Sequence, residues 1–246
     1  MKKFLLYTTA ALLLFGVAGY ISLQFFLGSI VKAGVNRFGP AITQTKVELK
    51  FASLSPLSGI GTLSGLTVGN PKGWSTLDAF HLGDVRISME PFSVLRDYIV
   101  INEIIIDQPE INYETKLISS NVGDLLKNIE AAMGGGKTSD PKTTAGKPIK
   151  LVVKKFVMTN ARVSLGIGTK AMTIPMPAVE LTDLGVAEGG ITPAELAGAV
   201  MRSITSSVVV ASTQALTKAG STSGAAAAEG IKKTGEAIKG LFGGKK

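Results

Sequence analysis

The stretch that decides the fold begins Gly61-Thr-Leu-Ser-Gly-Leu-Thr-Val-Gly-Asn-Pro-Lys-Gly-Trp74 and continues to Asn121. Asn70 and Pro71 predict a turn, because asparagine bonds its own backbone and the residue before a proline is disfavoured in the helical region. The whole segment predicts two strands joined by this turn, a short helical link over 91–96, two further strands, and a helix that Asn121 caps and that continues through Met133.

Within this stretch, the alternation of side chains predicts which strand faces are apolar. Val85, Ile87 and Met89 alternate with polar residues, which is the period of a half-buried strand. The next strand changes phase, because Ile101 and Ile104 lie three positions apart. This change indicates either a β-bulge near 102–103 or a strand that is buried on both faces.

The order of these elements resembles the N-terminal domain of the AsmA family of Gram-negative envelope proteins. The resemblance covers about residues 45–130. It rests on the Asn70-Pro71 turn after an alternating apolar run, on the Ile-x-Ile-x-x-Pro-x-Ile pattern at 104–111, and on the Asn-x-x-x-Leu-Leu helix start at 121–126. The family implies an inner-membrane anchor, a curved periplasmic sheet with an apolar concave face, and a part in phospholipid handling or outer-membrane assembly.

The N-terminal run from Phe4 to Val31 contains no charged residue and predicts a membrane anchor. As a helix it reaches about 42 Å, more than the ~30 Å that a bilayer core requires. Lys2 and Lys3 place the N-terminus in the cytoplasm, and the helix is expected to end at Gly39-Pro40. A signal peptide cleaved near Gly16-Val17-Ala18 is the alternative, but signal apolar regions are shorter, about 7–15 residues.

The second half of the chain repeats the pattern of strands and then changes to helix. Strands are expected over 149–158, 161–165, 172–176 and 179–184, and Pro175 and Pro177 place the third of these at a sheet edge. Thr192, Pro193 and Glu195 form a helix start of the capping-box type. The helix that follows is expected to pack in the fold rather than span a membrane, because Arg202 interrupts its apolar face.

These elements predict an α+β fold. An N-terminal transmembrane helix precedes a curved, mostly antiparallel β-sheet with helices packed on it and a helical C-terminus. The expected divisions are an anchor over 1–31, the first half of the sheet over 32–133, a flexible linker over 134–148 rich in glycine, lysine and threonine, the second half over 149–190, and C-terminal helices with a basic tail over 191–246.

Composition argues against several kinds of chemistry. The 246 residues include no cysteine and one histidine, His81, so thiolate metal sites, paired-imidazole sites and cysteine nucleophiles are excluded. Gly134-Gly-Gly-Lys-Thr138 lacks the first glycine of a phosphate loop. The net charge of +8 is dispersed and has few aromatic companions, which disfavours nucleic acid. The chain is therefore expected to be neither an enzyme nor a cofactor protein.

The remaining candidate site is the apolar face of the sheet, which the resemblance implies can hold phospholipid. Its candidate residues lie on three strands with purely apolar faces: Val47, Leu49 and Phe51; Val85, Ile87 and Met89; and Met172, Ile174 and Met176. The alternative is that these faces pack on the helices over 121–133 and 193–218 as an ordinary core. A second functional hypothesis is a membrane-anchored scaffold that binds an envelope protein partner.

Overall fold

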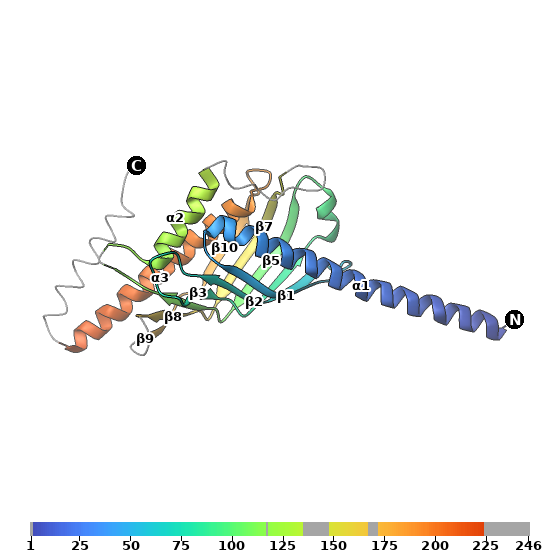
Figure 1. The fold of residues 1–246 in the computed structure, drawn as a ribbon, viewed down its shortest axis with the longest axis horizontal. Helices are drawn as coiled ribbons and strands as arrows, with labels where there is room; N and C mark the ends of the chain where they lie inside the picture. Colours follow the sequence, from blue (N-terminus) through green and yellow to red (C-terminus); the bar gives the residue numbers. More distant parts are fainter. Residues whose placement is uncertain (1, 117, 135–147, 167–171, 224–246) are drawn as a thin grey trace.

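The computed structural model describes residues 2–116, 118–134, 148–166 and 172–223 (Figure 1). A long N-terminal helix precedes ten strands, and two further helices lie against the sheet. The elements are α1 (Lys2–Thr43), β1 (Val47–Leu54), β2 (Ile60–Gly69), β3 (Asp78–His81), β4 (Asp84–Met89), the 3₁₀ helix η1 (Pro91–Leu95), β5 (Ile99–Asp107), β6 (Glu110–Tyr113), α2 (Asn121–Gly134), β7 (Leu151–Thr159), β8 (Arg162–Leu165), β9 (Met172–Pro175), β10 (Val179–Leu184) and α3 (Pro193–Ser223).

The sheet confirms the expected α+β class and joins the two halves of the chain. Its order is β10-β7-β5-β4-β2-β3-β6-β8-β9, with β1 paired to β2. Neighbours are antiparallel except where β5 meets β7 and β6 meets β8. Those parallel pairs span the chain crossover that contains α2, as parallel neighbours require. β9 and β10 end the order, and β9 is the Pro-punctuated edge that the sequence predicts.

The ten strands occupy only six positions across the sheet, because four pairs continue one another end to end. These pairs are β3 with β4, β5 with β6, β7 with β8, and β9 with β10. Six positions at the usual strand spacing give a width of about 24 Å.

A line of backbone irregularities bends the sheet where these pairs of strands meet. Gly65, Gly83, Gln108 and Asn160 have positive φ angles of 67°, 59°, 54° and 54°. Neighbouring breaks are hydrogen-bonded to one another, as from Gly65 N–H to the Gly83 carbonyl at 2.8 Å. At the same line, hydrogen bonds from Asn160 and Thr159 lower the pKa of Asp107. Because a residue with positive φ interrupts the extended course of a strand, a row of such residues across neighbouring strands bends the sheet.

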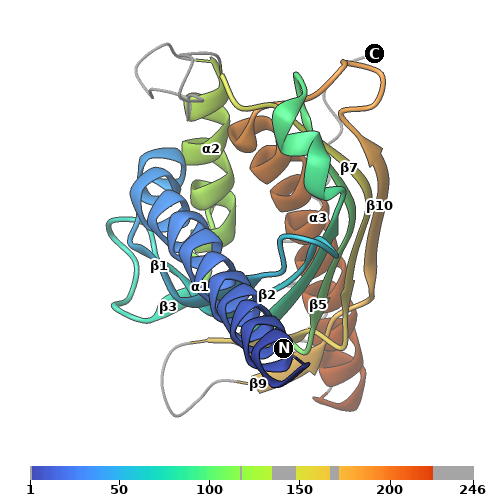
Figure 2. The ribbon, with the colours of Figure 1, turned by 90° about the vertical axis from the view of Figure 1, so that its right-hand side faces the viewer.

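The core lies inside this curve, where α2 and α3 pack on the sheet (Figure 2). α2 contributes Val122, Leu125 and Ile129, all at most 2% exposed, and α3 contributes Ile204 and Val208. Residues 193–215 are long and apolar enough to cross a membrane by composition, but 39% of that window is buried in the protein. α3 is therefore a packed helix of the fold, as the sequence predicts.

α1 combines an exposed apolar half with a half that runs along the outer edge of β1. The Asn36 side chain hydrogen-bonds both backbone groups of Leu49, at 2.6 Å from its N–H and 3.3 Å from its carbonyl. Farther toward the N-terminus, Gln24 bonds Ser53 at 3.0 Å. The helix thus covers a strand edge whose polar groups would otherwise be open to pairing with another chain.

Gly28 sets how closely α1 approaches β1. A Cβ atom at Gly28 would lie 2.1 Å from the Ala52 carbonyl oxygen, a distance that no real contact permits. The helix backbone therefore rests directly on the strand, and no larger residue fits this position without moving one of them.

The expected end of the first helix at Gly39-Pro40 is wrong, because α1 continues to Thr43 with Pro40 inside it. Proline has no backbone N–H, so the helix passes Pro40 without a bond from its nitrogen to the carbonyl four residues earlier. Gln44 N–H still bonds the Pro40 carbonyl at 2.9 Å. The candidate membrane span and the part of α1 that packs on the sheet domain consequently belong to one continuous helix.

The structure also shows the outcome of the expectations for β5, for the start of α3 and for the linker. The phase change in β5 is a bulge at Asn102, because Met89 pairs with Ile101 while Ser88 pairs with Glu103. The predicted capping box of α3 is present, with Thr192 N–H bonding the Glu195 carboxylate at 2.7 Å. Most of the linker, over 135–147, and the expected basic tail, over 224–246, lie outside the described residues.

We predict that Gly28→Ala lowers the stability of the domain by about 1–3 kcal/mol, the usual range for overpacking. Gly19→Ala is the matched control, because it lies in the same helix and, apart from that helix's own backbone, no atom lies within 4 Å of where its Cβ would stand. Both substitutions gain the same helix propensity, so their difference isolates the contact with Ala52. Thermal unfolding of the full chain in mild detergent measures it, and equal melting temperatures would contradict the close approach.

Candidate functional site

Most of the candidate lipid-facing residues are buried in the protein. Val47, Leu49, Val85, Ile174 and Met176 are at most 8% exposed, and Val85, Ile174 and Met176 belong to the core cluster beneath α2 and α3. Their side chains are occupied by protein contacts and are not free to hold lipid. For these positions the structure corrects the lipid-facing assignment in favour of an ordinary core.

Phe51 and Met172, in contrast, are exposed to solvent and do not join the buried faces. Their exposed fractions are 47% and 41%. On β1 the buried position shifts from Leu49 to Ala52, so Phe51 does not share the face of Leu49. The pairing with β2 is interrupted where Lys50 faces Gly65, the glycine with positive φ. A simple alternation through 47, 49 and 51 does not reveal this local break in the pairing.

Ile87 and Met89 remain half-buried and belong to a larger set on the same face of the sheet. Strand register places Leu54 and Ile87 on either side of Gly61, and Met89 opposite Ile101. We name this set the apolar strip. Its half-buried members are Leu54, Leu63, Ile87, Met89, Ile101 and Ile104.

On β4 and β5, burial along the concave face falls toward the end of the sheet from which α1 extends, whereas on β7 Phe156 and Val153 stay buried. Val85 and Ile106, near the bend, are at most 4% exposed. Ile87 and Ile104, the next pair along, are half-buried and pack only at the margin of the core. Figure 1 shows α2 and α3 over the part of the sheet away from the N-terminus. The apolar strip is what they leave partly uncovered.

A buried polar network fixes α2 over that far half. Asn121 is fully buried, and its side-chain oxygen accepts hydrogen bonds from Glu114 N–H at 2.9 Å and Val122 N–H at 2.8 Å. Its amide nitrogen donates to the Asn70 side chain and to the Asn112 carbonyl, each at 2.7 Å. The Asn-Pro turn and the start of α2 are thus held together across 51 positions of sequence.

The expected role of Asn121 as the helix cap is corrected by this geometry. The hydroxyl that caps α2 belongs to Ser120, which accepts the Gly123 N–H at 3.0 Å. Asn121 instead satisfies the backbone at the end of β6. A sequence pattern places an asparagine near a helix start but does not show which neighbour bonds the helix.

Glu114 carries a carboxylate into the same network with only 2% of its surface exposed. Asn70 donates to it at 2.8 Å, Ser75 N–H donates at 3.1 Å, and the Ser75 hydroxyl also bonds it. Burial raises the pKa of the neighbouring Tyr113 hydroxyl. These groups are occupied by one another, so their arrangement is that of a structural junction.

His81 is exposed at the end of β3, as expected. Among the described residues, no three histidine, cysteine, aspartate or glutamate side chains are placed to hold a metal ion.

No protein-family model, curated protein or solved structure matches this chain.

We predict that Asn121→Ala destabilises the fold by about 2–3 kcal/mol, because it leaves the buried Glu114 N–H without its partner. Asn112→Ala is the matched control, since its amide bonds the Asp78 carbonyl at an exposed site and should change stability by about 0.5 kcal/mol or less. Thermal unfolding of both variants provides the comparison. Similar losses would show that the network around Asn121 contributes nothing special.

Proposed function

We propose that this chain is an AsmA-like, single-pass inner-membrane protein whose periplasmic sheet domain binds phospholipid acyl chains during envelope and outer-membrane biogenesis. The single observation that carries the proposal is the decline in burial along β4 and β5 on the concave face. An apolar surface is partly uncovered at the end where α1, apolar enough to cross a bilayer, extends away from the domain.

The position of the apolar strip favours lipid as its ligand. Acyl chains are recognised by apolar area without directional bonds, and the strip offers aliphatic side chains on adjoining strands. The route from a membrane to the strip follows α1, which contacts Ser53 and Ser55 on either side of Leu54. A sheet about 24 Å wide is too small to bridge two membranes, so the proposed role is that of a shuttle or an accessory piece.

The alternative is a non-enzymatic scaffold that uses the same exposed surface to bind an envelope protein. Both functions place an apolar ligand on the strip, and they differ in the chemistry of that ligand. A covalent capture experiment separates them.

We predict that a photoreactive amino acid at Met89 or Leu54 captures phospholipid in membranes of cells that express the full chain. Phe51 is the matched control, because it lies on β1 but is exposed away from the buried face. Mass spectrometry of the adducts should show lipid at 54 and 89 and much less at 51. Protein adducts at 54 and 89 would support the scaffold, and equal lipid capture at all three would contradict a lipid site on the strip.

We also predict that the anchor is retained with the sheet domain in the periplasm. A reporter that works only after export, fused after Lys246, should be active in the membrane fraction, because Lys2 and Lys3 orient the helix. An inactive reporter would contradict the orientation. An active reporter in the soluble fraction, on a chain whose N-terminus lies near Gly19, would contradict retention.

A further inference from the structure

The short helix η1 buries its polar residue and exposes its apolar residues. Its one serine, Ser93, is fully buried, while Phe92, Val94 and Leu95 are 70%, 52% and 83% exposed. A surface turn of a water-soluble domain normally places such side chains the other way round. The inversion requires both a reason for Ser93 to be inside and an environment that suits the exposed apolar groups.

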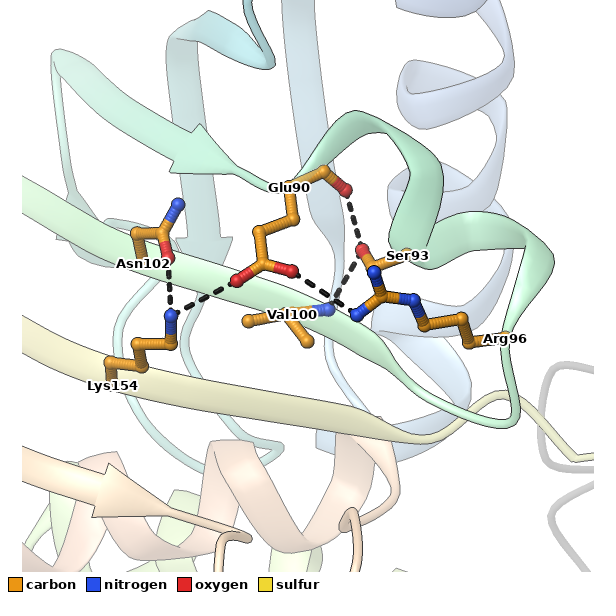
Figure 3. Close-up of polar contacts among 6 residues, drawn as sticks. All are labelled: Glu90, Ser93, Arg96, Val100, Asn102 and Lys154. Carbon is orange, nitrogen blue, oxygen red and sulfur yellow. Dashed lines mark hydrogen bonds and ion pairs between the residues drawn. The ribbon is translucent and has the colours of Figure 1, made fainter.

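Hydrogen bonds explain the buried serine (Figure 3). The Ser93 hydroxyl donates to the Glu90 carbonyl at 2.6 Å and accepts the Val100 N–H at 2.9 Å. It therefore connects the end of β4 to the start of β5 and fixes the rotation of η1. With Ser93 turned inward, its neighbours are necessarily turned outward.

Charged side chains brace the same turn. The Glu90 carboxylate pairs with Arg96 at 3.3 Å and with Lys154 on β7 at 3.0 Å, and Lys154 also bonds Asn102 at 2.9 Å (Figure 3). These contacts tie both ends of η1 to the sheet. The exposed apolar residues are thus presented on a supported turn.

The turn between β1 and β2 lies against η1 and exposes further apolar residues. A Cβ atom at Gly59 would meet the Met89 carbonyl oxygen at 2.0 Å and Pro91 Cδ at 3.1 Å. Beside this contact, Leu57 and Ile60 are 73% and 62% exposed. We name the combined surface the apolar rim, which consists of Leu57, Ile60, Phe92, Val94 and Leu95.

α1 fixes the height of the rim relative to a membrane. Tyr20 bonds Ser55 in the β1–β2 turn at 2.9 Å, so this turn lies level with Tyr20. A bilayer core takes about 20 helical residues, which, counted from Phe4, extend to about Leu23. The turn beside Tyr20 therefore lies at the boundary between acyl chains and headgroups, and Figure 1 shows η1 at the same end of the domain.

We propose that the apolar rim inserts into the leaflet on the domain's side and forms a second membrane contact beside α1. The inference rests on the anchoring of α1 in the proposed function, and it does not require lipid on the apolar strip. Insertion would place the exposed side chains in the interfacial layer that suits them. Two contacts, one spanning and one superficial, hold the domain in one orientation with the uncovered end of the concave face toward the bilayer.

The absence of cysteine from the chain allows single labels to test this directly. Full-length Leu95→Cys and Leu57→Cys variants are each labelled at the new cysteine with a polarity-sensitive fluorophore. They are then reconstituted in vesicles of phosphatidylethanolamine and phosphatidylglycerol. Ile118→Cys is the matched control, because Ile118 is an 88% exposed apolar residue just before the start of α2, away from the rim. Leu13→Cys, in the exposed half of α1, reports whether the anchor is inserted.

The expected result is that iodide quenches the labels at 95 and 57 about threefold less than the label at 118, while nitroxide-bearing phospholipid quenches them more. If iodide quenches the labels at 95 and 57 as strongly as the label at 118, while the label at 13 is shielded, the rim does not contact the membrane and the anchoring of α1 still holds. A label at 13 that is also accessible would overturn both. Shielding without quenching by nitroxide lipid would indicate protein on the rim and overturn the proposal.

Discussion

The direct contact of α1 with β1 is the constraint on which the rest of the structure depends. Gly28 allows the helix backbone to rest on the Ala52 carbonyl, and Asn36 occupies both backbone groups of Leu49. One helix therefore serves as a candidate membrane span and as the cover of a sheet edge. Because no loop separates these two uses, the direction of the exposed half of α1 is coupled to the orientation of the sheet.

The bend of the sheet explains how so small a domain has both a core and an uncovered apolar surface. Irregular positions at Gly65, Gly83, Gln108 and Asn160 line up across neighbouring strands. On one side of this line, α2 and α3 fill the concave face and exclude water. On the other side, the same apolar face continues with less cover, and the proposed lipid site occupies that remainder.

In this protein, the hydrogen bonds of buried polar side chains determine where apolar side chains remain exposed. Asn121 holds α2 at the far end of the sheet, which decides how much of the concave face is covered. Ser93 holds η1 at the near end, which decides that Phe92 and Leu95 face outward. In both places the loss of a buried hydrogen bond is costly, so the position of the apolar surface is well defined.

The sequence alone determined the features that depend on local patterns. The charge-free run from Phe4, the alternation through Val85 and Met89 and the capping box at Thr192 each specify an element without reference to distant residues. The bulge in β5 was also visible as a break in phase. Such patterns identify which residues form a strand or helix and which of its faces is apolar.

Only the tertiary structure decided which apolar faces are covered. Val85 and Met89 lie on one face of one strand, yet α2 and α3 cover the first and leave the second half-buried. The break in pairing at Gly65 moves Phe51 off the face of Leu49, and Ser93 turns the apolar residues of η1 outward. Each outcome depends on contacts between segments far apart in the chain, and local periodicity carries no information about those contacts.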